Sequence, residues 1–197
     1  MASTPPAFVR DTHRAYVAAL GKSKDTMEYC ATEHLRVSGV YWGVMAMELI
    51  AAGEEMGKPE IVEWVLSCQN TDGGFGGSPG HDSHMLYTLS SVQLLALCGA
   101  LDRLNRDPVV AFVAGLQDKT TGAFSGDKWG EIDTRFSYCA LNCLSLLQRV
   151  DAINVPAAVD FVLSCANFDG GFGCVPGAES HAGQIFCCVG ALSIAGK

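Results

Sequence analysis

The chain repeats itself with a period of about 49 residues, and this repeat constrains the fold more than any other feature of the sequence. Three segments align, each joining a hydrophobic stretch to a glycine-rich loop: residues 64–84, 112–135 and 161–181. A proline opens each unit, 49 and 48 residues apart, at Pro59, Pro108 and Pro156. Proline is favoured in the first turn of a helix, where its missing N–H is not needed. The repeat therefore predicts a series of units that each begin with a helix.

Each glycine-rich loop leads into a second helix that is apolar nearly all round. These helices are predicted over residues 85–97, 136–147 and 182–194. A helix without a polar face must be covered by neighbours on most sides. Residues 34–50 look like the buried helix of an earlier unit. We therefore expect an all-α fold of helical hairpins, each with one surface helix and one buried helix.

Four such hairpins form either an open solenoid or part of a closed ring. In a ring, the buried helices would form an inner barrel, with their N-terminal ends gathered at one mouth of a cavity. The residues predicted to open these helices are His34, His84, Arg135 and His181. Each of them could simply cap or pack its own loop, but their recurrence at one repeat position favours a shared functional role.

Composition and charge argue against several other classes of protein. The chain has 197 residues, of which 49% are hydrophobic and 17% charged, and its formal net charge is −8 without any basic block. This balance argues against binding to nucleic acid or to anionic lipid. The longest nearly apolar run, residues 185–196, is shorter than the roughly 18–20 residues that cross a bilayer. We expect a cytoplasmic protein without membrane insertion, with its nine cysteines reduced and mostly in the core.

Several segments resemble the β-subunits of protein prenyltransferases. The resemblance rests on the GGFG loops, on the Ser-His pair before the last buried helix, and on WGEIDTRFSYCA at residues 129–140. Residues 33–43 and 130–140, together with segments within residues 151–188, are similar to the β-subunits of Rab geranylgeranyltransferases (type II) in particular. The likeness extends from about Tyr16 to the end of the chain. It implies an α/α toroid of six helical hairpins around an apolar funnel that holds geranylgeranyl diphosphate.

The resemblance also implies an activity, a cofactor and partners. The enzyme would transfer geranylgeranyl to C-terminal cysteines of Rab proteins through a thioether bond, with one zinc ion activating the acceptor thiolate. The β-subunit would pair with an α-subunit, and the Rab GTPase would arrive on a Rab escort protein. Such an enzyme needs donors near the diphosphate, which leaves as the C–O bond breaks.

The site residues follow from the resemblance position by position. His181 matches the family histidine that contacts the diphosphate, and it is the expected catalytic residue. Arg135 and Tyr138 match residues near lipid and peptide. Ser38 and Leu89 match positions at the closed end of the funnel, where farnesyl-transferring relatives carry bulky aromatics. The remaining expected lipid-binding positions are Tyr87, Ala182, Gly183 and Cys187.

The sequence also departs from the family pattern. The zinc ligands of relatives include a D-x-C motif, which does not occur here, so we expect the aspartate, cysteine and histidine ligands to lie beyond Lys197. Six units of about 49 residues need roughly 290 residues. Residues 1–197 are therefore expected to form one domain of about four units, an incomplete ring truncated at its C-terminus and inactive alone.

Two other readings remain open from the sequence. A terpenoid cyclase relative would share the helical toroid, but it needs an acidic motif to protonate its substrate. The approaches to such a motif here, Asp127, Glu131 and Asp133, lack the required spacing. A non-catalytic helical-repeat fragment is the second alternative. Zinc and lipid binding would separate these possibilities.

Overall fold

The structure, a computed structural model, describes residues 7–22 and 24–197. These residues form α-helices joined by loops and short 3-10 turns, and they contain no β-strand. None of the helices in these ranges has the length and apolar character needed to cross a membrane. The helices are α1 (Arg10–Leu20), α2 (Met27–Ala31), α3 (Arg36–Leu49), α4 (Lys58–Ser67), α5 (Met85–Leu97), α6 (Arg106–Gly115), α7 (Thr134–Leu146), α8 (Val155–Ser164) and α9 (Ala182–Ile194).

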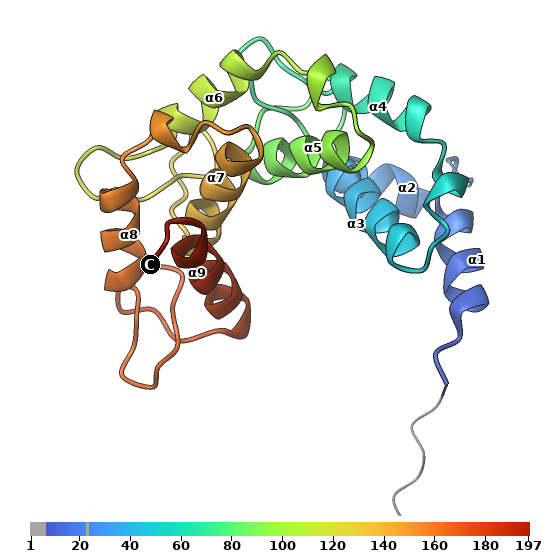
Figure 1. The fold of residues 1–197 in the computed structure, drawn as a ribbon. Helices are drawn as coiled ribbons and strands as arrows, with labels where there is room; N and C mark the ends of the chain where they lie inside the picture. The colour runs from blue at the N-terminus through green and yellow to red at the C-terminus, as the bar shows by residue number, and fades with distance from the viewer. Residues whose placement is uncertain (1–6, 23) are drawn as a thin grey trace, which may run out of the picture.

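The helices form an arc with two layers (Figure 1). The inner helices α3, α5, α7 and α9 pack side by side in chain order along the concave side. The outer helices α4, α6 and α8 lie on the convex side, each against the inner helix that follows it in the chain. This arrangement confirms the predicted helical hairpins. The predicted bounds of α5 and α9 agree with the structure, whereas α7 begins two residues earlier than predicted.

Hydrogen bonds to the glycine-rich loops join the inner helices α3, α5 and α7 each to the next hairpin. The amide of Val37 at the start of α3 donates to the Gly77 carbonyl (3.0 Å). In the same way, Met85 of α5 donates to Gly126 (2.7 Å), and Thr134 of α7 donates to Cys174 (2.9 Å). The first amides of a helix have no acceptor within the helix, so a neighbouring carbonyl satisfies a donor that would otherwise be unpaired. These bonds hold the inner helices in one common register.

The cysteines behave mostly as core residues. All nine are free thiols, and five of them are buried: Cys68, Cys139, Cys143, Cys165 and Cys188. Burial raises the pKa of the Cys143 thiol to about 12 and that of Cys68 to about 11. These groups are therefore neutral thiols near pH 7. Cys30, in contrast, is exposed.

The last inner helix presents an apolar face to solvent. Ile185, Phe186 and Val189 of α9 are exposed, although the residues one repeat earlier on α7 that match Ile185 and Val189, Ser137 and Leu141, are fully buried. In α7 these positions are covered by α9, since α7 and α9 are neighbours. Among the described residues, no further inner helix covers α9. An extended apolar face of this kind is typical of a surface that another element covers.

Two loop glycines give a test of how the hairpins pack. Gly73 and Gly80 both have positive φ, +91° and +80°, but a Cβ on Gly73 would overlap the Pro108 carbonyl, whereas a Cβ on Gly80 meets nothing within 4 Å. The left-handed conformation alone costs an L-residue about 1–2 kcal/mol. We expect Gly80→Ala to lower the free energy of unfolding by about that amount, and Gly73→Ala by about 3 kcal/mol or more because α6 must also shift. Urea unfolding of the two variants measures the difference. Equal losses would show that the contact with α6 does not matter.

Candidate functional site

The N-terminal ends of the inner helices share one capping position. His84, Asp133 and His181 are the N-cap residues of α5, α7 and α9, 49 and 48 residues apart. Arg135, which the sequence predicts to open α7, is instead the second residue of that helix. His34 was also predicted to be equivalent to His84, but it lies in a 3-10 turn before α3. The two errors have different causes: the loop before α7 is longer than the other two, and an additional 3-10 turn that contains His34 precedes α3.

His181 caps α9 with its own side chain. The Gly183 amide donates to Nδ1 of His181 (N···N 3.0 Å). Nδ1 therefore carries no proton in this arrangement, and the neutral ring carries its proton on Nε2. Ser180 does not cap the helix, because its hydroxyl donates to Asp169 within the loop (2.8 Å). The imidazole is exposed, so Nε2–H is free to meet a ligand.

His84 has the same capping bond in a different environment. Its Nδ1 accepts from the Leu86 amide (3.1 Å), and its ring lies 5.5 Å from the rings of both Tyr87 and Phe136. Its Nε2 is so close to Gly126 that a Cβ there would come within 2.7 Å. Burial lowers the pKa of His84 below its ordinary value. His84 thus packs between two hairpins, whereas the described residues do not cover His181 in this way.

Asp133 replaces these histidines at the start of α7. Its Oδ1 accepts from the Arg135 amide (2.8 Å) and from Nε2 of Gln184 on α9 (3.2 Å). Its other oxygen lies 2.9 Å from an Arg135 guanidinium nitrogen. The Asp133 hydrogen bond raises the pKa of Arg135, whose Nε is buried without a hydrogen-bond partner. Sequence reasoning missed Asp133 and Gln184 as site residues, although the 49- and 48-residue spacing of the N-caps would have identified Asp133.

One stripe of side chains on each inner helix faces the concave side of the arc. Val37, Met85 and Thr134 make equivalent bonds, which match positions in α3, α5 and α7, and the shared cap position of His84, Asp133 and His181 extends the match to α9. Positions spaced i, i+4, i+7 and i+11 lie on one face of a helix. Most of these residues are half-buried or exposed, unlike those that face the outer helices. This concave stripe consists of Ser38, Trp42, Met45, Leu49, Leu86, Ser90, Gln93, Leu97, Arg135, Cys139, Asn142, Leu146, Gly183, Cys187, Gly190 and Ile194.

The predicted site residues lie on or beside the concave stripe. Ser38, Arg135 and Gly183 share its first position, and the Ser38 hydroxyl lies 3.0 Å from that of Ser90 on α5. Leu89 and Tyr138 share the position three residues later, which is only about 4.5 Å further along the helix axis. Ser38 on α3 and Leu89 on α5 therefore lie at nearly the same height along the helix axes as His181. They are separated from it around the arc, because His181 is at the start of α9.

The remaining predicted residues are also near the N-terminal halves of these helices. Tyr138 packs edge-on against Phe186 of α9 (5.5 Å between centroids), and its hydroxyl accepts from Asn142 (3.1 Å). Burial raises the pKa of Tyr138 and of Tyr87. Burial also raises the pKa of the half-buried Cys187 thiol to about 11. Cys187 is therefore suited to line an apolar wall and not to act as a thiolate.

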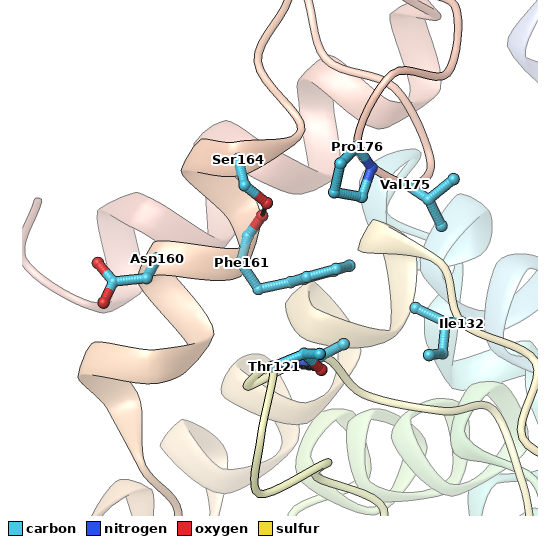
Figure 2. Close-up of a pocket in the computed structure, with 8 residues that line it drawn as sticks. Thr121, Ile132, Asp160, Phe161, Ser164, Val175 and Pro176 are labelled. Carbon is cyan, nitrogen blue, oxygen red and sulfur yellow. Dashed lines mark hydrogen bonds between the residues drawn. The ribbon is translucent and has the colours of Figure 1, made fainter.

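A cleft also lies outside the concave stripe. A cleft of about 400 Å³ lies between α8, the loop that joins α6 to α7 and the loop that follows α8, against the ring of Phe161 (Figure 2). Its other walls include Thr121, Ile132, Val175 and Pro176. None of the predicted site residues lines it. It belongs to the outer layer of the arc, and we do not place the functional site there.

The described residues do not provide a metal site. No three His, Cys, Asp or Glu side chains come together to hold a metal ion in the described part of the chain. The acidic residues considered for a cyclase are also engaged. Asp127 accepts from the Trp129 amide (2.8 Å), Asp133 caps α7, and Glu131 lies 3.9 Å from Arg135. Nothing in this arrangement favours a proton-donating carboxylic acid.

Comparisons with known proteins agree with this architecture. Residues 8–197 match a family model described as "Prenyltransferase alpha-alpha toroid domain". The chain is 47% identical over 194 residues to geranylgeranyl transferase type-2 subunit beta of Saccharomyces cerevisiae, with 96% of this chain and 59% of the relative covered. It is 52% identical over 190 residues to subunit beta 1 of the type-2 enzyme of Arabidopsis thaliana, with 96% and 59% covered. The Candida albicans subunit is 39% identical over 214 residues, with 100% and 62% covered.

A solved structure shows the same fold at much lower sequence identity. It is that of Candida albicans protein geranylgeranyltransferase-I complexed with GGPP, with a TM-score of 0.73 and 18% identity. The match covers 81% of this chain and 49% of that chain. The curated relatives are longer as well, since the chain spans 59–62% of their length. From the family match over residues 8–197 and the two-layered arc of helical hairpins, the chain belongs to the prenyltransferase alpha-alpha toroid domain family.

Proposed function

We propose that this chain supplies the larger part of the β-subunit of a Rab geranylgeranyltransferase, as about four of the six hairpins of its toroid. The observation that carries the proposal is the identity of 47–52% to type-2 β-subunits over 96% of the chain. In the proposed reaction, the thiol sulfur of a Rab cysteine attacks C1 of geranylgeranyl diphosphate. The C–O bond breaks, a thioether forms, diphosphate leaves, and the thiol proton is lost.

His181 is proposed to stabilise the leaving diphosphate. Its exposed Nε2–H is a hydrogen-bond donor, since the Gly183 amide occupies Nδ1. A side-chain donor at a helix N-terminus suits a developing oxyanion. The Arg135 guanidinium is proposed to add positive charge from the neighbouring helix.

The geranylgeranyl chain is proposed to run across the inner helices. It would start near Gly183 and Cys187 on α9, pass Tyr138 and Tyr87, and end near Ser38 and Leu89. The common register of the inner helices supports this path, because these residues lie at similar heights around the arc. Burying each CH₂ of such a chain contributes about 0.8 kcal/mol. A small serine and an aliphatic leucine leave room at the end of the path for a twenty-carbon chain.

The cofactor and partners are proposed from the family. A zinc ion would activate the acceptor thiolate, but the described residues do not offer its ligands, and no step proposed here passes through it. The name of the relatives, subunit beta, supports a partner α-subunit. We also propose that the Rab GTPase is presented by an escort protein and that the enzyme is cytoplasmic.

The proposal is tested in a chimera that completes the toroid. Residues 8–197 replace the matching segment of the S. cerevisiae type-2 β-subunit, which is then assembled with its partner subunit; we refer to this assembly as the completed enzyme. We expect it to transfer geranylgeranyl from geranylgeranyl diphosphate to a Rab protein, whereas the 197-residue chain alone is inactive. The measurement is single-turnover incorporation of labelled lipid. A folded chimera that neither binds the diphosphate nor transfers lipid would contradict the proposal.

A further inference from the structure

Two clefts occupy equivalent positions in successive hairpins. The cleft of about 400 Å³ lies against Phe161 of α8, and a second cleft, of about 260 Å³, lies against Phe112 of α6, 49 residues earlier. The loop that joins α6 to α7 lines both of them, with Ile132 in the first and Trp129 in the second. The two clefts are therefore neighbours that share this loop as a wall.

An exposed tryptophan lies on the shared loop. Trp129 is 77% exposed, but its backbone is held in a closed turn. Its amide donates to the Asp127 carboxylate (2.8 Å), and the Gly130 amide donates to the Asp127 carbonyl (3.3 Å). A preformed aromatic side chain loses little conformational freedom on binding, and tryptophan is enriched among the residues that dominate binding energy at interfaces. Trp129 is therefore suited to anchor a polypeptide that crosses the shared loop.

The two clefts differ in chemistry. Mainly apolar side chains line the cleft at Phe161, which Figure 2 shows with Asp160 at one side. The charged residues that line the cleft at Phe112 are Asp72, Asp82, Asp127 and Lys128. The Lys128 ammonium lies 3.5 Å from Asp82, but both side chains are mostly exposed, so this pair is weak. The first cleft therefore suits an aliphatic side chain, and the second suits a basic one.

Both clefts lie beside the N-terminal ends of the inner helices, where the candidate site is. Ile132, in the first cleft, directly precedes Asp133, the N-cap of α7. Ser83, in the second cleft, directly precedes His84, the N-cap of α5. A protein acceptor whose cysteine reaches His181 therefore comes close to the loops that line both clefts.

The repeat also sets the spacing between the two clefts. Neighbouring helices pack about 8–10 Å apart. In the polyproline II conformation a chain advances about 3.1 Å per residue with three residues per turn, so side chains three positions apart point to the same side about 9 Å from each other. An extended segment can therefore place one side chain in each cleft when the two residues are three positions apart.

We propose that the two clefts form a docking groove for an extended segment of the protein acceptor. A basic residue of this segment enters the acidic cleft, a residue three positions away enters the apolar cleft at Phe161, and Trp129 contacts the chain between them. This inference rests on the proposed function, in which the acceptor is a Rab protein. The groove takes no part in the chemistry. It raises the effective concentration of the acceptor near His181, and its carboxylates select a basic segment.

Photo-crosslinking in the completed enzyme identifies the occupant of the groove. Ser164 lines the cleft at Phe161 and is exposed, so p-benzoylphenylalanine is introduced in its place. With the Rab acceptor on its escort protein, we expect crosslinks to the Rab segment that precedes the prenylated cysteines. The same group at Ser67, the equivalent exposed position of α4 outside both clefts, should give none. Crosslinks to the partner subunit or to the escort protein instead, or no crosslink, would overturn the proposal.

Filling the groove should weaken acceptor binding and leave the chemistry unchanged. Ser164→Trp is expected to raise the KM for the Rab acceptor about tenfold, with kcat and the Kd for geranylgeranyl diphosphate unchanged. Ser67→Trp should change none of these quantities. An unchanged KM in Ser164→Trp, or an equal loss in lipid affinity, would contradict the docking role.

Reversing charge in the groove tests the preference for a basic segment. Asp82→Lys with Asp160→Lys should raise the KM for the acceptor, and the increase should shrink at high salt because exposed charges are screened. The matched control is Asp102→Lys with Asp151→Lys, since these two exposed aspartates follow the C-terminal ends of α5 and α7. Equal effects of the two pairs would show that net charge matters and the groove does not.

A double-mutant cycle links the groove to the acceptor. Replacing the basic and aliphatic residues of the crosslinked Rab segment with serine should raise the KM in the unmodified enzyme and cause no additional loss in Ser164→Trp. Additive losses would contradict the proposal. Crosslinking does not require lipid transfer, so crosslinks without transfer would contradict the proposed function alone, whereas transfer without crosslinks would contradict the groove alone.

Discussion

Replacing His181 with alanine in the completed enzyme is expected to slow prenyl transfer on the order of 100-fold. The expected rise in the Kd for geranylgeranyl diphosphate is much smaller, because the apolar wall provides most of the ground-state affinity and the lost donor acts mainly on the leaving group. Neighbouring positive charge such as that of Arg135 is expected to compensate in part for the lost donor, so the loss of rate should not go far beyond about 100-fold. Single-turnover rates, lipid titration and thermal melting on the same preparations measure the three quantities.

His84 offers a matched control for this prediction. It makes the same capping bond at the start of α5, so His84→Ala and His181→Ala should each lose about 1 kcal/mol of stability from the lost cap. Only His181→Ala should slow transfer, because His84 is enclosed between Tyr87 and Phe136. His181→Asn, which can cap the helix and still donate from its amide, should recover part of the rate. A normal rate in the folded fraction of His181→Ala would eliminate His181 as the catalytic donor.

The combined substitution Ser38→Trp and Leu89→Tyr is expected to reverse the preference for lipid length. Larger side chains would fill the space for the last isoprene unit, whose five carbons are worth several times the roughly 0.8 kcal/mol of one CH₂. We expect the ratio of kcat/KM for farnesyl diphosphate over geranylgeranyl diphosphate to rise on the order of 100-fold. Tyr138 occupies on α7 the register of Leu89 on α5, so a tyrosine is already accommodated at this position in one hairpin.

The control for the lipid-length prediction introduces the same two types of substitution, serine to tryptophan and leucine to tyrosine, on the convex side of the arc. Ser67 of α4 and Leu163 of α8 are exposed on outer helices. Ser67→Trp with Leu163→Tyr should leave the ratio at its original value, because neither side chain reaches the concave stripe. If the inner and outer pairs shift the ratio equally, the change is not caused by filling the lipid path. An unchanged ratio in the inner pair would mean that Ser38 and Leu89 do not line its end.

Much of the fold could be predicted from the sequence, because the repeat consists of local patterns. Proline at the start of a helix, glycine in the loop and an apolar second helix are each set by the properties of neighbouring residues. These patterns identified the hairpins, placed α5 and α9 with the bounds observed, and assigned one helix of each hairpin to the interior. The resemblance to prenyltransferase β-subunits, carried by the loop and inner-helix motifs, then named the family.

The register of the inner helices, in contrast, was decided only by the tertiary structure. The bonds from Met85 to Gly126 and from Thr134 to Cys174 join different hairpins, and no local pattern encodes which carbonyl meets which amide. Without these bonds, the sequence matched His34 to His84 and Arg135 to His181, although the repeat spacing of 49 and 48 residues already pointed to Asp133 as the cap of α7. The sequence itself determined which residues can cap a helix, which can line the concave side and which can cover the core. Long-range hydrogen bonding and packing determined that His84 is enclosed by the following hairpin, which the capping bond that it shares with His181 does not reveal.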